Sequence, residues 1–319
     1  MKTLKQLSTE FLTLKSALIF CHIRPDGDTL GSAVALALAL RQKGIKCSIM
    51  CEGIIPERLA INSTFNEILG VENFSGKYDA HISVDIASEH LFGRAWGIYE
   101  SAEKKYAIDH HTSNSRFTSN LYLESAPATA IIVYKLLEEM QIHFTKEICE
   151  SLLMGIVTDT GNFMHNCTNA ECMKTAGKLM EYGADLQKIT CQVFKNQSKG
   201  RSDLYLSVMQ KSRFYLDGKL VIIAVHKNDL KTFGVNESET EGFVDYPLTI
   251  SGVEVSVSVL EFKNELYRVS FRSKGKVNVN SVANEFGGGG HLFASGCVIA
   301  GLYEEVIEKI IRAVDINIY

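Results

Sequence analysis

Histidine and aspartate side chains recur in this sequence where apolar segments end. His22, Asp26 and Asp28 follow the apolar run SALIFC, and the same residue types recur in SVDIAS, IDHH and VTDTGNF, which supply Asp85, Asp109, His110, His111 and Asp159. Each residue alone could be a helix cap or a solvated turn residue. Together they would form a cluster of carboxylates that is unfavourable to bury without cations. Two cations in such a cluster could activate a water for attack on phosphorus.

The donor types narrow the choice of metal. Imidazole nitrogens and carboxylate oxygens without cysteine favour Mn²⁺, Fe²⁺ or Co²⁺ over structural zinc, with Mg²⁺ as an alternative. The 8 cysteines form no Cys-x-x-Cys pair, so their spacing does not indicate a zinc site.

Strands and helices alternate around these motifs in the first half of the chain. Short apolar runs predict strands at residues 16–23, 47–51, 81–87 and 105–109, with a polar loop at 24–29. Helical patterns cover residues 30–44, 128–140 and 146–157. The sequence therefore predicts a parallel sheet covered on both faces by helices, with the polar motifs at the carboxyl ends of its strands.

The second half of the chain has a different hydrophobic pattern. Alternating apolar runs predict strands at residues 220–226, 253–262 and 266–273, and a helix at 302–315 closes the chain. A polar stretch, KNQSKGRSD, separates the two halves. We predict an α/β fold with a metal-binding catalytic domain at 1–187, a linker at 188–205 and a smaller α/β substrate-binding domain at 206–319.

Composition excludes several classes of protein. The chain has 319 residues, 46% of them hydrophobic and 22% charged, with a formal net charge of −4, as in an ordinary folded protein. Without a basic field, binding to long duplex nucleic acid is not expected. The longest apolar run is about half of what a membrane helix needs, and the charged N-terminus does not resemble a signal peptide. We expect a cytoplasmic protein with no membrane partner.

The motifs, taken in order, resemble a known family. HIRPDGD, SVDIAS, IDHH and VTDTGNF look like the four successive motifs of the DHH phosphoesterases, and FRSKGKVNVNSVANEFGGGGHLFASG is similar to the DHHA1 signature. The resemblance spans nearly the whole chain. Length and the GGGGH segment most resemble the NrnA-like nanoRNase/pAp phosphatases. RecJ exonucleases share the motifs but are larger, and family II pyrophosphatases carry a different C-terminal domain.

The resemblance implies a role for each motif residue. One metal ion would have three ligands: His22, Asp26 and Asp85. The other would have four, with Asp85 shared between the ions: Asp28, Asp85, His110 and Asp159. His111 would contact phosphate or donate a proton. Asp109 would orient the histidine pair, because a ligating histidine commonly donates its second N–H to a carboxylate. The expected catalytic residues are thus Asp85, Asp109, His110 and His111.

The second domain is expected to hold the substrate through these residues: Arg268, Arg272, Ser273, Gly288, Gly289, Gly290 and His291. Arg268 and Arg272 share a strand face by the two-residue period, and a guanidinium suits phosphate. Glycines allow backbone N–H groups to approach a phosphate closely. The alternative for the glycine run is a plain flexible turn.

The expected activity is that of a phosphoric ester hydrolase, either an exonuclease or a 3′(2′),5′-bisphosphate nucleotidase. A hydroxide bridging two metal ions, Mn²⁺ by preference with Mg²⁺ or Co²⁺ as alternatives, would hydrolyse short single-stranded RNA oligonucleotides to mononucleotides and 3′-phosphoadenosine 5′-phosphate (pAp) to AMP. Hydrolysis of cyclic di-AMP or pApA is the nearest rival, and pyrophosphate or polyphosphate hydrolysis is a weaker one. A nucleotide-binding regulator without catalysis is the non-enzymatic alternative. The sequence leaves open whether the protein forms a homodimer.

Overall fold

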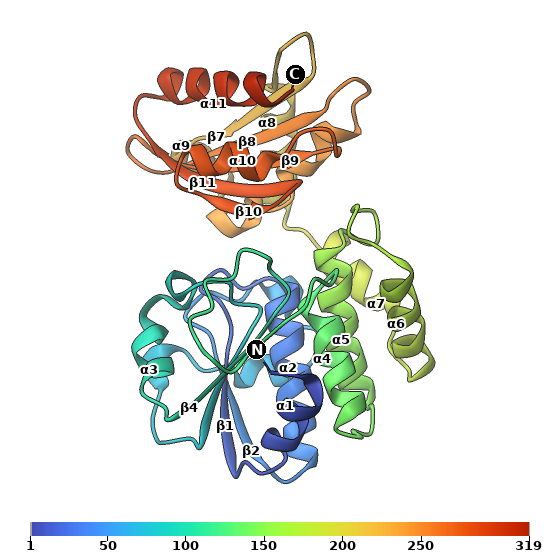
Figure 1. The fold of residues 1–319 in the computed structure, drawn as a ribbon. Coiled ribbons are helices and arrows are strands. Elements are labelled where there is room, and N and C mark those ends of the chain that lie inside the picture. The colour runs from blue at the N-terminus through green and yellow to red at the C-terminus, as the bar shows by residue number, and fades with distance from the viewer. Residues whose placement is uncertain (1, 319) are drawn as a thin grey trace. The chain divides into compact units, whose positions relative to one another are not determined.

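The computed structural model describes residues 2–318 of the chain (Figure 1). The chain divides into two compact units, with the boundary between Asn196 and Gln197. The helices of the described residues are all too short or too polar to cross a bilayer.

The first unit contains a five-stranded sheet in which every pair of neighbours is parallel. Its strands, in spatial order, are β2 (Lys46–Met50), β1 (Ser16–Phe20), β3 (Ala80–Val84), β4 (Lys104–Asp109) and β5 (Leu121–Leu123). The predicted parallel sheet is confirmed. Because the strands are parallel, their carboxyl ends lie along one edge of the sheet.

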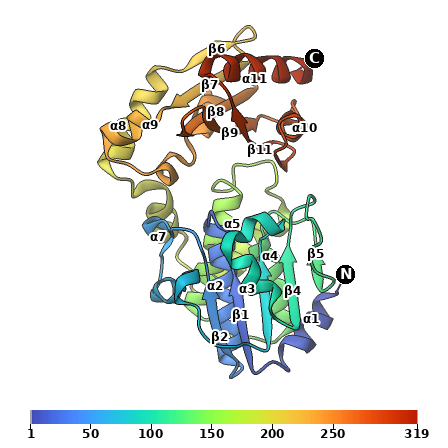
Figure 2. The same ribbon diagram turned by 90° about the vertical axis from the view of Figure 1, so that its left-hand side faces the viewer.

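Helices on one face of this sheet enclose the main core, and aromatic residues cover the other face. The first group is α1 (Leu4–Phe11), α2 (Gly27–Gln42), α4 (Thr129–Glu139) and α5 (Lys146–Asp159). The opposite face carries α3 (Trp96–Glu100) and the 3₁₀ helix η4 (Glu89–Ala95) (Figures 1 and 2). Strand β1 serves both cores, since Ala17 and Ile19 face the helices whereas Leu18 and Phe20 face the aromatic cluster.

Shorter elements complete the unit. Three 3₁₀ helices connect β2 to β3: η1 (Glu57–Leu59), η2 (Ser63–Glu67) and η3 (Val71–Asn73). After α5 follow α6 (Ala170–Glu181), α7 (Leu186–Thr190) and a π-helix, η5 (Cys191–Lys195).

Helices α2 and α5 approach each other so closely that glycine is needed at their contact. A methyl group at Gly31 of α2 would lie 2.2 Å from the carbonyl oxygen of Ser151 in α5. A methyl group at Gly155 of α5 would lie 2.8 Å from Asp28 Oδ1. The close contact therefore also brings the backbone of α5 next to an aspartate of the predicted metal site.

The second unit contains a mixed six-stranded sheet. In spatial order its strands are β10 (Gly289–His291), β11 (Ala294–Ala300), β9 (Leu266–Ser273), β8 (Val255–Lys263), β7 (Leu220–Val225) and β6 (Arg213–Tyr215). Strands β7 and β8 are parallel, and the other described pairs are antiparallel.

Two layers of helices flank this second sheet. The core on one face packs beneath α10 (Val279–Glu285) and α11 (Tyr303–Ile318). The core on the other face packs against α8 (Lys199–Gln210), α9 (Lys227–Phe233) and the 3₁₀ helix η7 (Phe243–Thr249), which follows η6 (Glu237–Thr240) (Figure 2).

Helices extend into the two segments that the sequence analysis assigned to a loop and to a linker. The loop predicted at 24–29 is shorter, because α2 begins at Gly27 and the Asp26 side chain caps it. The linker predicted at 188–205 is mostly helical. Its serine and glycine have specific structural roles: Ser198 accepts a hydrogen bond from the Arg201 N–H and caps α8, while Gly200 lets α8 approach the Phe233 carbonyl of α9.

Candidate active site

The loop after β1 places two aspartates at the start of α2. Asp26 Oδ1 accepts hydrogen bonds from the backbone N–H groups of Asp28 (3.0 Å) and Thr29 (3.1 Å). Its other oxygen, Oδ2, lies 3.5 Å from His22 Nε2. The residue that caps the helix therefore also faces His22, which links the local fold to the site.

Asp28 occupies the first turn of α2 and points to the amino end of α4. It is fully buried. Its Oδ2 accepts from the Thr129 N–H (2.6 Å) and its Oδ1 from the Ala130 N–H (2.9 Å). The first N–H groups of a helix have no partner within the helix and favour negative charge nearby. The fold thus fixes this carboxylate from an element about 100 residues away in the sequence.

Asp85 directly follows β3 and has a left-handed backbone with φ 59°. Aspartate tolerates this conformation better than most residues. The buried carboxylate accepts from Thr129 Oγ1 (2.9 Å) and lies 3.7 Å from His22 Nε2 and 3.5 Å from His110 Nε2. It is therefore the acidic group that both histidines share.

His110 follows the last residue of β4, and its ring is held in one orientation. Its Nδ1 lies 2.8 Å from the Ala126 carbonyl oxygen, so Nδ1 carries the proton and Nε2 is directed to the carboxylates. Nε2 lies 3.4 Å from Oδ2 of Asp159, the last residue of α5. The sequence analysis placed Asp159 just beyond this helix.

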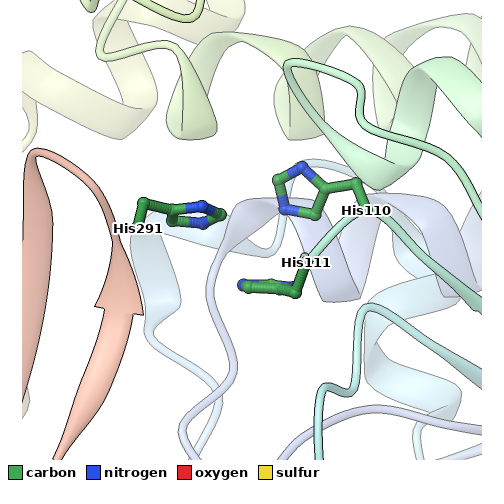
Figure 3. A group of neighbouring side chains, drawn as sticks. All are labelled: His110, His111 and His291. Carbon is green, nitrogen blue, oxygen red and sulfur yellow. The ribbon is translucent and has the colours of Figure 1, made fainter. Parts of the chain in front are cut away.

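Asp109 and His111 form a hydrogen-bonded pair beside His110. The fully buried Asp109 accepts from His111 Nδ1 at 2.8 Å through Oδ1. The same oxygen accepts the backbone N–H of His110 at 2.9 Å. The two histidine rings lie edge to face with centroids 4.4 Å apart (Figure 3). His291, also drawn in Figure 3, belongs to the second unit and is described with it below.

The described residues of the first unit contain three groups of side chains whose ligand atoms lie within 4.8 Å of one another. One is Asp85–Asp109–His111, and the predicted metal ligands form the two donor sets His22–Asp26–Asp85 and Asp28–His110–Asp159. Asp85 Oδ1, 3.5 Å from His110 Nε2, connects them. Carboxylate and imidazole donors without sulfur fit Mn²⁺, Mg²⁺ or Co²⁺. These residues therefore fit a pair of divalent cations.

Burial and mutual charge shift the titration of this cluster in the metal-free protein. Burial, together with the charges of Asp85 and Asp159, raises the pKa of Asp28 well above its ordinary value. Burial also raises the pKa of Asp159. Burial alone would raise the pKa of Asp85 too, but the hydrogen bond from His22 and the charges of the neighbouring histidines lower it instead. Such opposed shifts are typical of catalytic sites.

Two histidines are held as cations when no metal is present. Burial alone would lower the pKa of His22, but Asp26 and Asp85 outweigh it and raise the pKa to about 10. Burial opposes charging of His111 as well, and Asp109 and Asp85 raise its pKa to about 10. Both folded-state values lie above the ordinary value of 6.5.

These shifts predict a pH dependence of stability for the metal-free protein. A pKa raised by folding stabilises the fold fully below the unfolded pKa, and this contribution is lost as the pH rises through the folded pKa. In EDTA, the free energy of unfolding should therefore fall between pH 6.5 and about pH 10. Urea unfolding followed by fluorescence of Trp96, the one tryptophan of the chain, measures it.

The matched variants are His111→Gln and His143→Gln. His143 is an exposed histidine between α4 and α5. His111→Gln should flatten the decline, and His143→Gln should leave it unchanged. If the free energy of unfolding fell equally with pH in the wild type and in His111→Gln, the decline could not be assigned to His111.

The predicted substrate-binding arginines lie on the less buried face of β9. Along β9, Arg268, Ser270 and Arg272 alternate with three residues that face the core. Arg272 Nε lies 3.2 Å from Asp245 Oδ1 of η7, and Arg268 Nη1 lies 3.3 Å from Glu237 Oε2 of η6. Each guanidinium is therefore oriented by a carboxylate of the same unit.

His291 lies on the same face as Arg272. The register pairs Arg272 with Ala294, and Ala294 with His291. Opposed residues of antiparallel strands carry their side chains on one face. Ser273, by contrast, is buried on the other face, and its Oγ accepts the N–H groups of Gly275 and Val277. This residue closes a turn and is not on the face of the arginines.

The glycine run ends a helix and begins an edge strand. Gly287 has φ 71° after α10, and the N–H of Gly288 donates to the Ala283 carbonyl, so this N–H is already engaged. A methyl group at Gly288 would lie 2.2 Å from the Gly296 carbonyl oxygen, and one at Gly290 would lie 2.6 Å from that of Ala294. A methyl group at Gly289 would meet nothing closer than 3.8 Å. The pairing with β11 thus requires glycine at 288 and 290, whereas position 289 has room.

Three supporting residues were missed by the sequence analysis. Thr29 Oγ1 donates to the Val84 carbonyl, Thr129 contacts both Asp28 and Asp85, and Asn114 donates to Asp109. Their polar types are common at helix starts and turns, and most of their partners are distant in sequence. No local signal distinguishes them from ordinary caps.

The fold and the site together define a class of enzyme. A parallel α/β unit with a histidine–aspartate cluster at its strand ends, followed by a mixed-sheet unit, is the architecture of a metal-dependent phosphoesterase. The N-terminal domain of the DHH family matches residues 16–156, and the DHHA1 domain matches residues 217–318. The chain belongs to the DHH family and is a phosphoester hydrolase.

Individual relatives cover almost the whole chain. The bifunctional oligoribonuclease and PAP phosphatase NrnA of Thermus thermophilus is 30% identical over an alignment of 311 residues, and the match covers 93% of this chain and 88% of that relative. The cyclic-di-AMP phosphodiesterase GdpP of Bacillus subtilis is 25% identical over 98% of this chain, which spans 49% of that relative. The crystal structure of an exopolyphosphatase-related protein from Bacteroides fragilis superposes with a TM-score of 0.89 and 27% identity, covering 98% of this chain and 95% of that one.

Proposed function

We propose that the protein hydrolyses short single-stranded RNA oligonucleotides to mononucleotides and pAp to AMP. The observation that carries the proposal is the pair of donor sets, His22–Asp26–Asp85 and Asp28–His110–Asp159, at the strand ends of the first unit. The similarity to an oligoribonuclease and PAP phosphatase over 93% of the chain supports the choice of substrate.

The two donor sets would each hold one divalent cation, Mn²⁺ by preference, with Asp85 shared. Such a pair of cations, when bound, supplies a water activated for attack on phosphorus and neutralises charge on the phosphate oxygens. Mixed imidazole and carboxylate ligands support Mn²⁺ over Ca²⁺, which takes oxygen ligands, and over structural zinc. Mg²⁺ and Co²⁺ remain the alternatives to test.

Side chains of the protein would orient the substrate and donate a proton to the leaving oxygen. Asp109 accepts from Nδ1 of His111 and favours the doubly protonated ring, so Nε2 can also present an N–H to a phosphate or leaving oxygen. Nδ1–H of His110 is fixed on the Ala126 carbonyl, which keeps its Nε2 available as a ligand atom. These two neighbouring histidines would therefore have different tasks.

The less buried face of β9 would bind the nucleotide or its terminal phosphate. Arg268, Arg272 and His291 are donors on this face. A guanidinium binds phosphate through paired N–H groups. A short row of donors suits a substrate of a few nucleotides better than a long polymer.

Purified protein with Mn²⁺ should be incubated separately with pAp, an end-labelled RNA trinucleotide, cyclic di-AMP, pApA and pyrophosphate. We expect release of AMP from pAp and of mononucleotides from the trinucleotide, both abolished by EDTA. Chromatography of the products over time measures each rate. Metal-loaded protein that turns over neither of these two substrates would refute the proposal.

Cyclic di-AMP or pApA hydrolysis is the second candidate, favoured by the similarity to GdpP over 98% of the chain. Turnover of cyclic di-AMP or pApA, without turnover of pAp or the trinucleotide, would favour this second function over the first. Binding of all the nucleotides without turnover of any would instead support a regulator.

A further inference from the structure

A buried asparagine joins the two strand ends that carry Asp85 and the Asp109–His110–His111 triplet. Asn114 is 8% exposed. Its Nδ2 donates to Asp109 Oδ2 at 2.7 Å and to the Ile86 carbonyl at 3.1 Å. Its Oδ1 accepts the backbone N–H of Arg116 at 2.7 Å. Both N–H groups and the oxygen of the amide are thus used, each on a different partner.

The first contact restricts rotation of the Asp109 carboxylate. Asp109 Oδ1 accepts from His111 Nδ1 and from the His110 N–H, and Oδ2 accepts only the Asn114 amide among the described hydrogen bonds. Because Asp109 is fully buried, loss of the amide would leave Oδ2 without this donor. A buried acceptor without a donor is costly, so the carboxylate would turn and carry the His111 ring with it.

The second contact holds the turn that presents Asp85. Ile86 follows Asp85, whose φ of 59° is left-handed. The Asn114 amide fixes the Ile86 carbonyl from the neighbouring loop, and the Ser115 N–H fixes the Ala87 carbonyl at 2.8 Å. One side chain therefore sets both the orientation of His111 and the backbone next to Asp85.

We propose that Asn114 is a positioning residue for phosphoester hydrolysis, which keeps the His111 ring aligned with Asp85. It touches neither substrate nor any of the predicted ligand atoms, and it acts through Asp109 and Ile86. The inference rests on the roles proposed above for Asp85 and His111. Outer partners that orient metal-site residues typically contribute about 10- to 100-fold in activity or metal affinity.

The test compares Asn114→Ala with Asn120→Ala. Asn120 is the matched control, because its Nδ2 also donates to a backbone carbonyl, that of Lys105, which lies at the end of β4 opposite to Asp109. We expect Asn114→Ala to lower kcat about 10- to 100-fold with KM changed less than about threefold, and Asn120→Ala to leave both unchanged. Asn114→Leu keeps the size of the side chain and removes both donors, so it replaces Asn114→Ala if that variant does not fold.

A second readout does not need turnover. In NMR spectra of the metal-free protein, the His111 Nδ1–H resonance should shift or broaden in Asn114→Ala and stay in place in Asn120→Ala. An unchanged resonance and an unchanged kcat would overturn the inference. Equal losses of Tm and of activity in the two variants would also overturn it, since the role would then be structural. A wild type without turnover would refute the proposed function, while the resonance would still test Asn114.

Discussion

Replacement of Asp85 by asparagine should lower turnover by about 10³-fold or more. Asp85 contacts both donor sets, and the stabilisation that metal ions give to developing charge is several kcal/mol, where each 1.36 kcal/mol is tenfold in rate. Asparagine suits the left-handed backbone of residue 85 and can still accept the hydrogen bond from Thr129, so the fold should persist. Initial rates with the fastest substrate, and Mn²⁺ retained after dialysis, measure the effect.

Asp79→Asn is the control for this prediction. Asp79 precedes the same strand β3 and accepts the N–H groups of Lys15 and Ser16 at its opposite end. It should keep wild-type rates and metal content. Asp85→Asn protein that retains two Mn²⁺ ions and a tenth of the wild-type rate would contradict the central role of Asp85.

Replacement of Gly31 by valine should destabilise the first unit by about 3 kcal/mol, the upper part of the usual range for overpacking. Its Cβ would lie 2.2 Å from the Ser151 carbonyl oxygen, so α2 and α5 would have to move apart. For a unit of this size, this corresponds to a Tm lower by about 6–12 °C. Thermal unfolding followed by Trp96 fluorescence reports on this unit, because Trp96 lies within it.

Gly177→Ala is the matched control and should have the opposite sign. Gly177 lies within α6, and a methyl group there would meet no heavy atom within 4 Å. Alanine in an exposed helix position should stabilise by about 0.5–1 kcal/mol, because it restricts the unfolded chain. A Gly31→Val protein with the same Tm as the wild type would show that α2 and α5 are not tightly packed at this position.

Much of the first unit could be predicted because its signals are local. Apolar runs indicated β1 to β4, and histidine or aspartate at their ends indicated a shared site, since parallel strands end at one edge. The face shared by Arg268 and Arg272 followed from the two-residue period of a strand.

The parts that were missed depend on contacts between distant segments. The hydrogen bonds of Thr129 to Asp28 and Asp85 span 101 and 44 residues. Gly200 lies in the polar stretch predicted as a linker, and it allows the contact of α8 with the Phe233 carbonyl. The composition of a segment does not reveal such partners.

The carboxylates that orient the two arginines of β9 should affect how ligand binding to this face responds to charge. An anion that binds Arg272 would compete with Asp245, and one that binds Arg268 would compete with Glu237, since each guanidinium already has an acidic partner. Salt weakens binding to nucleic acids chiefly because counterions released from phosphates are recaptured. Here the competing anions are the carboxylates of Asp245 and Glu237, which belong to the protein and cannot diffuse away. Their negative charge would repel an incoming phosphate. Ligand binding to this face should therefore select for geometry and phosphate chemistry more than for net negative charge.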